Sequence, residues 1–202
     1  MRSMRVRRAL VAAAVAAGIG GGAAVAQQDS IRADTTARRT PAGPFSLVVD
    51  LSDRELHVLE GEEVVKSFRV AIGTDEHPTP RGQFRINRII WNPRWVPPDA
   101  AWARNRRPRE PGDPRNPMGR VKMFFRAPDY YIHGTHEEDS LGQAESHGCI
   151  RMRNGEIIEL ARLVMENGGE RRSPNWFTQV INRVRSTRDV RLSQPVPVRI
   201  RE

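Results

Sequence analysis

The sequence is short of cysteine and lysine and lacks internal repeats. With one cysteine, Cys149, the chain cannot form an internal disulfide, which leaves three fates for the thiol: a buried filler, an intermolecular bridge or a reactive group. Lys66 and Lys122 are the only lysines among 33 basic residues, a bias that reflects genome composition more than function. The arginine-rich stretch 104–109 belongs to no nucleic-acid recognition motif, so no nucleic-acid partner is expected.

The N-terminal stretch has the pattern of an export signal. Four arginines within the first eight residues precede an acid-free apolar run, 9–26, which ends in Ala-Val-Ala before polar residues. A basic head, an apolar middle and a small-residue end are typical of a secretory signal peptide. Because the run is mostly Ala and Gly, cleavage after Ala26 is favoured over an uncleaved anchor. We therefore expect a signal peptide at 1–26, export to the periplasm or cell envelope, and no stable membrane insertion after cleavage.

Size and charge fit one exported domain. Removal of 26 of the 202 residues leaves 176, enough for a single domain with its own core. The signal contains four of the 33 basic residues and none of the 24 acidic ones, so the remainder keeps a net charge of +5. A basic exported protein is drawn to acidic polymers, and a carboxylate-rich cell wall is one.

The pattern along the chain is mainly β, of the α+β class, with a few helices. Residues 27–44 are polar and resemble a linker, and apolar-rich strand patterns begin at Phe45. Strands are predicted at 45–51, 54–59, 64–72, 83–91, 130–133 and 190–200, the last interrupted by two prolines. One helix is predicted from an Asn154 N-cap to Gly168, and a second starts at Ser173. We expect one catalytic domain over 45–202.

An irregular, proline-rich stretch occupies 91–119. Loops this long are uncommon in compact domains unless they serve a function such as a lid. A surface insertion without a role is the alternative. The aromatic residues Trp91, Trp95 and Trp102 favour a cover over a cleft.

Two short segments carry the chemistry. The first is His133-Gly134-Thr135, and the second is Ser146-His147-Gly148-Cys149. A thiol becomes a good nucleophile when a nearby imidazole takes its proton, giving a thiolate–imidazolium pair. His147 lies two residues from Cys149 and His133 can approach from another strand end. Gly148 permits a close approach of the backbone to a substrate and offers an amide for an oxyanion.

A metal site and a structural cluster remain as alternatives. His133, His136, His147 and Cys149 are residue types that bind zinc. However, the spacing of His133 and His136 on a loop is not one that zinc sites use, and His-x-Cys is a weak signal.

These residues resemble a known family. Together, 133–135 and 146–152 are similar to the signature of the YkuD-type L,D-transpeptidases, particularly the ErfK/YbiS/YcfS/YnhG group. Residues 78–84, Pro-Thr-Pro-Arg-Gly-Gln-Phe, resemble the P-T-P-x-G-x-F stretch of the family. The resemblance covers roughly 45–165 and implies a YkuD-like β-sandwich with a few short helices.

The resemblance also implies roles. Cys149 matches the acylated nucleophile and His133 the general base and acid, with no cofactor and no metal. The carbonyl of Gly134 would orient that histidine, replacing the carboxylate of a usual triad. The supporting positions are His147, Gly148 and the Cys149 amide around the oxyanion, and Ser146 and Arg151 as substrate contacts. His77 and His136 match nothing in the family and are expected to be surface histidines.

The reaction implied by the resemblance has two half-steps and serves cell-wall organisation. Cys149 attacks the carbonyl of the third residue, a diamino acid, in a peptidoglycan tetrapeptide stem and expels D-Ala. An amine of a second stem then takes the acyl group, giving a 3-3 cross-link. Water as acceptor would make the enzyme an L,D-carboxypeptidase, and an envelope lipoprotein lysine would make it an anchoring enzyme. A peptidoglycan-binding module without catalysis is the non-enzymatic alternative.

Overall fold

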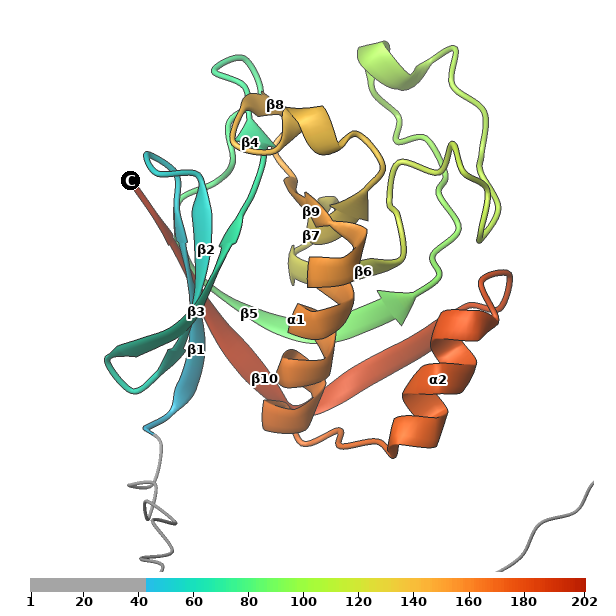
Figure 1. Cartoon of the computed structure of the whole chain (residues 1–202). Coiled ribbons are helices and arrows are strands. Elements are labelled where there is room, and N and C mark those ends of the chain that lie inside the picture. The colour runs from blue at the N-terminus through green and yellow to red at the C-terminus, as the bar shows by residue number, and fades with distance from the viewer. Residues whose placement is uncertain (1–42) are drawn as a thin grey trace, which may run out of the picture. The chain divides into compact units, whose positions relative to one another are not determined.

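The computed structural model describes residues 43–202 (Figure 1). The strands are β1 (Phe45–Asp50), β2 (Glu55–Glu60), β3 (Glu63–Arg69), β4 (Ile72–Gly73), β5 (Gly82–Trp91), β6 (Val121–Arg126), β7 (Tyr130–Thr135), β8 (Ala144–Ser146), β9 (Ile150–Arg153) and β10 (Arg188–Arg201). The helices are α1 (Asn154–Asn167) and α2 (Pro174–Asn182), with short 3-10 turns at Ala101–Ala103 and Glu138–Ser140. The predicted signal peptide, and all but the end of the predicted linker, lie outside the described residues. No helix within 43–202 has the length and apolar character needed to cross a membrane.

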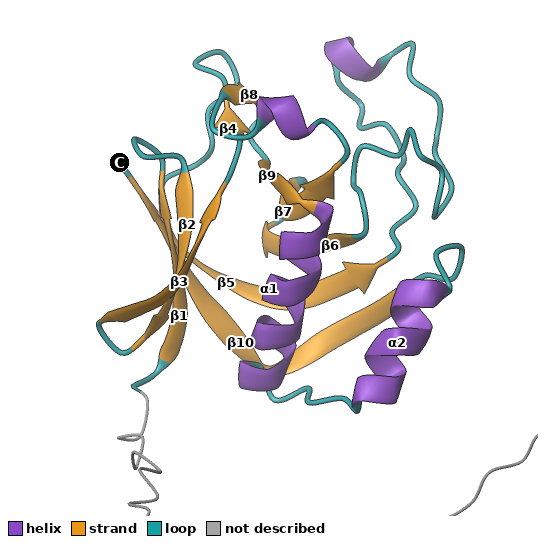
Figure 2. Ribbon diagram, in the orientation of Figure 1, coloured by secondary structure: helices purple, strands orange, loops and turns teal. Residues whose placement is uncertain are grey.

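Eight strands form one continuous sheet in the order β3-β2-β1-β10-β5-β6-β7-β9. Neighbours are antiparallel except for the parallel pairs β1–β10 and β7–β9. The long central strands β5 and β10 bend strongly and carry three strands on either side (Figure 2). The mainly β class is therefore confirmed. The two layers expected of a sandwich are two halves of a single curved, barrel-like sheet.

The two edges of this sheet meet close in sequence to Cys149. Just after β3, Ala71 forms an isolated antiparallel bridge with Arg151 on the opposite edge strand, β9. The Ala71 N–H donates to the Arg151 carbonyl at 3.0 Å, and the reciprocal bond is 2.9 Å. This contact satisfies backbone groups that an open edge would leave unpaired. The strand that follows Cys149 is therefore paired on both sides.

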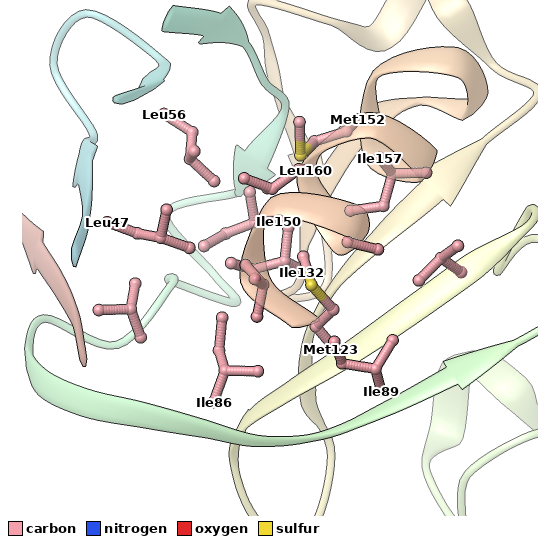
Figure 3. Packing of buried hydrophobic residues seen from close by; sticks show 14 of the residues in the cluster. Leu47, Leu56, Ile86, Ile89, Met123, Ile132, Ile150, Met152, Ile157 and Leu160 are labelled. Carbon is pink, nitrogen blue, oxygen red and sulfur yellow. The ribbon is translucent and has the colours of Figure 1, made fainter. Parts of the chain in front are cut away.

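Helix α1 fills the space that the curved sheet encloses. Its apolar residues recur with helical spacing and are buried at 157, 160, 161, 164 and 165. They pack against Ile132, Ile150 and Met152, which come from β7 and β9 (Figure 3). Each fully buried side chain of this size contributes roughly 1.5–3 kcal/mol by leaving water. This packing fixes β7, which contains His133, and β9, which begins just after Cys149.

Asn154 does not cap α1 as the sequence predicted. The N-cap position is Arg153, which makes no side-chain capping bond, and Asn154 is the first helical residue. The Asn154 side chain instead bonds other segments: Oδ1 accepts from the Arg120 N–H and Nδ2 donates to the Thr135 carbonyl, both at 2.9 Å. The asparagine therefore ties the start of α1 to the end of β7 and to the end of the long loop.

The long loop is fastened at its base. Asn92 has φ 47°, and its backbone N–H donates to the Arg120 carbonyl at 2.7 Å. The Asn92 side-chain amide donates to the carbonyls of Val180, Arg183 and Ser186 at the end of α2. The beginning and the end of the loop are thus joined to each other and to this helix.

Two further predictions concern the ends of elements. The side chain of Ser173 accepts a hydrogen bond from the Trp176 N–H at 3.3 Å, so the predicted start of the second helix is confirmed. Trp91 is not part of a cover: it ends β5 and is 1% exposed. Its ring packs edge-on against Trp176 with centroids 5.9 Å apart, so it belongs to the core.

Candidate active site

The two chemical segments line one cavity of about 1010 Å³. His133, His147 and Cys149 all line it, together with residues of the long proline-rich loop, including Trp95 and Trp102. Between residues 92 and 120 this loop carries a two-residue bridge, in which Trp95 and Arg109 exchange backbone hydrogen bonds of 2.9 Å. The loop forms a wall of the cavity, which favours the interpretation as a cover over a surface insertion without a role.

Cys149 lies between β8 and β9, at a short turn that faces the cavity. The residue is half-buried, and its thiol donates to the Asp129 carbonyl at 3.3 Å. Burial raises the pKa of Cys149 to about 11, although the Tyr131 backbone N–H and the charges of Arg151 and Lys122 oppose this. At neutral pH the side chain is therefore a protonated thiol.

His133 is buried on β7 and is held in one orientation. Its Nδ1 lies 2.7 Å from the carbonyl oxygen of Gly134, and a carbonyl only accepts, so Nδ1 carries the proton. The Nε2 lone pair is then left to take a proton. Burial lowers the pKa of His133 to about 4, with the Gly134 bond opposing and Arg151 and Lys122 adding to the effect.

The resting state is therefore a neutral thiol beside a neutral imidazole. A thiolate–imidazolium pair is the reactive form that the sequence argument considered, and the directions of both pKa shifts oppose its formation before the attack. The cause is desolvation, which penalises both charged forms. Proton transfer from Cys149 to His133 is then expected when the thiol attacks rather than before.

Ser146 and Gly148 build the turn that holds the thiol. The Ser146 hydroxyl donates to the Cys149 carbonyl and accepts from the Gly148 N–H at 3.1 Å. Gly148 has φ +97°, and a side chain there would meet the Tyr130 ring at 2.9 Å. Both residues are thus engaged in hydrogen bonds within the turn. The roles of Gly148 at the oxyanion and of Ser146 at the substrate stay predictions.

The Cys149 backbone N–H lies at this turn and has no hydrogen-bond partner within residues 43–202. A backbone amide beside the nucleophile is suited to stabilise a developing oxyanion.

His147 joins three segments through its ring. The Trp102 indole stacks on it with centroids 4.0 Å apart and planes 17° apart. His77 lies on it as well, with centroids 4.9 Å apart. Burial, His77, Arg151 and Arg106 all lower the pKa of His147. His77 is exposed, as expected, but belongs to this ring group.

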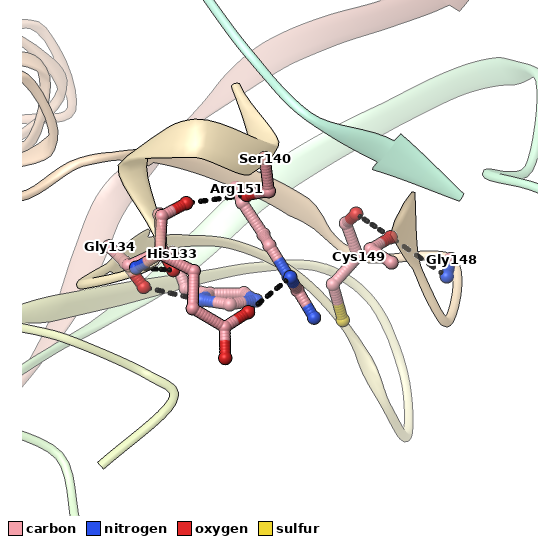
Figure 4. A network of polar contacts seen from close by, with 9 residues as sticks. His133, Gly134, Ser140, Gly148, Cys149 and Arg151 are labelled. Atoms are coloured by element: carbon pink, nitrogen blue, oxygen red, sulfur yellow. Dashed lines mark hydrogen bonds and ion pairs between the residues drawn. The ribbon is translucent and has the colours of Figure 1, made fainter. Parts of the chain in front are cut away.

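Arg151 lines the cavity together with His133 and Cys149. Its Nη1 donates to Glu137 at 2.9 Å, and its side chain is 17% exposed. Figure 4 shows its guanidinium between the His133 ring and the Cys149 sulfur in this view. His136 also lines the cavity, and its Nδ1 lies 3.3 Å from the Asn154 amide nitrogen.

Three site residues were missed from the sequence. Glu137 pairs with Arg151, Lys122 is the register partner of His133 on β6, and Tyr131 presents its backbone to Cys149. The alternation of apolar residues along 121–125 was a signal for Lys122, because it places that side chain on the face opposite the core. Within 43–202, no three His, Cys, Asp or Glu side chains are grouped so that they could hold a metal ion.

Residues 44–194 match the family model for the L,D-transpeptidase catalytic domain, YkuD. A Bacillus licheniformis protein with the provisional name L,D-transpeptidase YkuD is 34% identical over 121 residues, which cover 60% of this chain and 61% of the relative. A Salmonella typhimurium protein, provisionally named L,D-transpeptidase ErfK/SrfK, is 31% identical over 121 residues, or 55% of this chain and 38% of the relative. The similarity thus spans less than two thirds of either relative.

The fold also has a solved counterpart. The catalytic domain of the Enterococcus faecium L,D-transpeptidase superposes with a TM-score of 0.50 at 16% identity. The superposition covers 78% of this chain and 96% of that domain.

Proposed function

Because the chain belongs to the YkuD family of L,D-transpeptidase catalytic domains, we propose that it is a peptidoglycan L,D-transpeptidase with Cys149 as nucleophile and His133 as base. One observation carries the assignment of roles. His133 and Cys149 face the same cavity, and the 2.7 Å bond between Nδ1 and Gly134 leaves Nε2 to receive a proton.

The first half-step acylates the enzyme. The Cys149 thiol gives its proton to Nε2 of His133 as its sulfur bonds to the carbonyl carbon of the third stem residue. The oxyanion that forms is stabilised by the Cys149 N–H. The bond from that carbon to the D-Ala nitrogen then breaks, and the imidazolium returns the proton to the departing amine. The products are a thioester and free D-Ala.

The second half-step transfers the acyl group. An amine of a second stem gives a proton to His133 as its nitrogen attacks the thioester carbon. The carbon–sulfur bond breaks, the proton passes to the sulfur, and a 3-3 cross-link is released. Water in place of the amine gives an L,D-carboxypeptidase, and a lipoprotein lysine gives an anchoring reaction. All three outcomes share the first half-step.

The place of action follows from the substrate. Peptidoglycan lies outside the cytoplasmic membrane, so the enzyme acts in the periplasm or cell envelope after export. The basic, apolar and small-residue pattern of residues 1–26 supports a signal peptide.

The test is a mass-spectrometric assay on purified tetrapeptide stems with a free diamino-acid amine. We expect release of D-Ala and a dimer joined between third residues. Thiol alkylation should stop the reaction, EDTA should not slow it, and Cys149→Ala should be inactive while still folded. Pentapeptide donors with 4-3 linkage, or activity in Cys149→Ala, would overturn the proposal.

A further inference from the structure

Strand β9 presents two arginines away from the core, and two consecutive glutamates bind them. Arg151 pairs with Glu137 and Arg153 with Glu138, each at 2.9 Å. The two pairs differ in their surroundings. The side chain of Arg151 is 17% exposed and lines the cavity, whereas that of Arg153 is 51% exposed and lies outside it.

The backbone of Glu137 is fixed while its side chain extends through solvent. Its N–H donates to the Thr135 hydroxyl at 3.0 Å. Its carbonyl accepts from the N–H and the hydroxyl of Ser140, at 3.1 and 2.6 Å. The side chain itself is 72% exposed and has Arg151 as its partner. The carboxylate can therefore swing away from Arg151 without breaking a backbone bond.

Arg151 has capacity for another anion. A guanidinium has five N–H donors and binds carboxylates best through two of them. Within 43–202, only Nη1 of the Arg151 side chain makes a hydrogen bond. Arg151 lines the same cavity as Cys149, His133 and His147, so an anion bound to its guanidinium shares that cavity with the reacting atoms.

We propose that Glu137 is an internal carboxylate that occupies the anion site of Arg151 and is displaced by the substrate carboxylate nearest the bond to be broken. This rests on the proposed function, in which that group is the terminal carboxylate of D-Ala, three bonds from the attacked carbon. Glu137 is then a specificity-determining residue that competes with the carboxylate of the acyl-donor stem for Arg151. An ion pair with one exposed partner is weak, so the competition costs about two- to fivefold in affinity for an anionic reagent.

The test compares Glu137→Gln with Glu138→Gln. Both variants remove one negative charge from the same loop, but only the first frees an arginine inside the cavity. Cys149 is the only thiol, so its alkylation can be followed by intact mass at mildly alkaline pH. Iodoacetate carries a carboxylate and iodoacetamide does not, and the ratio of their rates cancels changes in thiol reactivity.

We expect the iodoacetate-to-iodoacetamide ratio to rise about two- to fivefold in Glu137→Gln and to stay unchanged in Glu138→Gln. Arg151→Gln should lower the ratio, and adding Glu137→Gln to Arg151→Gln should change nothing further. An unchanged or lower ratio in Glu137→Gln, or an equal rise in both glutamine variants, would overturn the proposal.

The alkylation assay needs no turnover, which separates the two proposals. If the ratio rises as expected while stem peptides are not processed, the proposed function fails and the anion site remains. With an active enzyme, Glu137→Gln should lower KM for the tetrapeptide and leave kcat unchanged. A fall in kcat would instead mean that Glu137 positions Arg151 for the reaction, which contradicts displacement.

Discussion

The indole of Trp102 stacks on the imidazole of His147 with ring centroids 4.0 Å apart, which joins the long loop to the residue two positions before Cys149. The stack is the place where the cavity wall touches the nucleophile turn. It also shields His147 from water, and burial is the first cause of the lowered pKa of that histidine.

Replacement of Trp102 by alanine should raise the pKa of His147 toward its ordinary value, because the ring becomes hydrated on the face that the indole covers. An aromatic pair contributes about 0.5–1.5 kcal/mol beyond its burial, so a small loss of unfolding free energy should accompany the change. NMR titration of the His147 ring protons measures the shift. Val96→Ala is the control, because Val96 is exposed and lines the same cavity without touching His147 in a ring contact. An unshifted pKa in Trp102→Ala would contradict this account.

Substitution of His133 by glutamine should lower kcat by about 10²–10⁴, the usual contribution of a general acid–base group. His147→Gln should have a smaller effect, because its ring is stacked between Trp102 and His77 rather than oriented by a backbone carbonyl. Steady-state release of D-Ala measures both. If His147→Gln were inactive and His133→Gln nearly normal, the two roles would be reversed.

The pH dependence follows from the two shifted groups. Burial lowers the pKa of His133 to about 4, so the imidazole is a competent base above that value and is lost as a base when the pH falls through it. The rate of acylation by a stem peptide should therefore be constant around neutral pH and should decline as the pH falls toward about 4. Because burial raises the pKa of Cys149 to about 11, alkylation by iodoacetamide should increase steadily from neutral to alkaline pH. A plateau of alkylation at neutral pH would show a preformed thiolate instead.

The sequence predicted which residues would react but not how they are held. The spacing of His133 and Cys149 carried the chemistry, and the structure brings both to one cavity. The hydroxyl of Ser146 could not be assigned from the sequence, because its partners are backbone groups whose positions depend on the φ of Gly148. The burial of both side chains could not be predicted from the pattern, and burial opposes a thiolate–imidazolium pair before a substrate is attacked.

The same reasoning applies to the fold. Apolar residues at strand spacing or at helical spacing predicted several strands and the helix of residues 154–167, because such spacing reflects one buried face. The strands β6, β8 and β9 were not predicted. The closure of the sheet through Ala71 and Arg151 was not predictable, since it depends on backbone groups far apart in the chain. Asn154 was misjudged for a similar reason: a local capping pattern competed with tertiary partners, Arg120 and Thr135, which the sequence does not reveal.

Asn154→Ala should therefore destabilise the fold more than the loss of a helix cap would. It leaves the Arg120 N–H and the Thr135 carbonyl without their partner, at a cost of about 1–3 kcal/mol for each group left unsatisfied. Urea unfolding followed by circular dichroism measures the change. Gly155→Ala is a matched neighbour on the same helix, where an added Cβ would meet nothing within 4 Å. That variant should gain about 0.5–1 kcal/mol, and a loss there would contradict the helical geometry.

The hydrogen bond between Asn92 and Arg120 has a consequence for exchanging the loop between them. The two ends of the loop are held by each other and by the end of α2, and Asn116 adds an internal bond of 2.7 Å to the Pro93 carbonyl. Residues 93–119 are thus held at both ends by contacts outside the loop, and inside it by Asn116 and by the stack of Trp102 on His147. We expect that a segment of different length or charge grafted between Asn92 and Arg120 would change the cavity wall and leave the register of β7 and β9 intact.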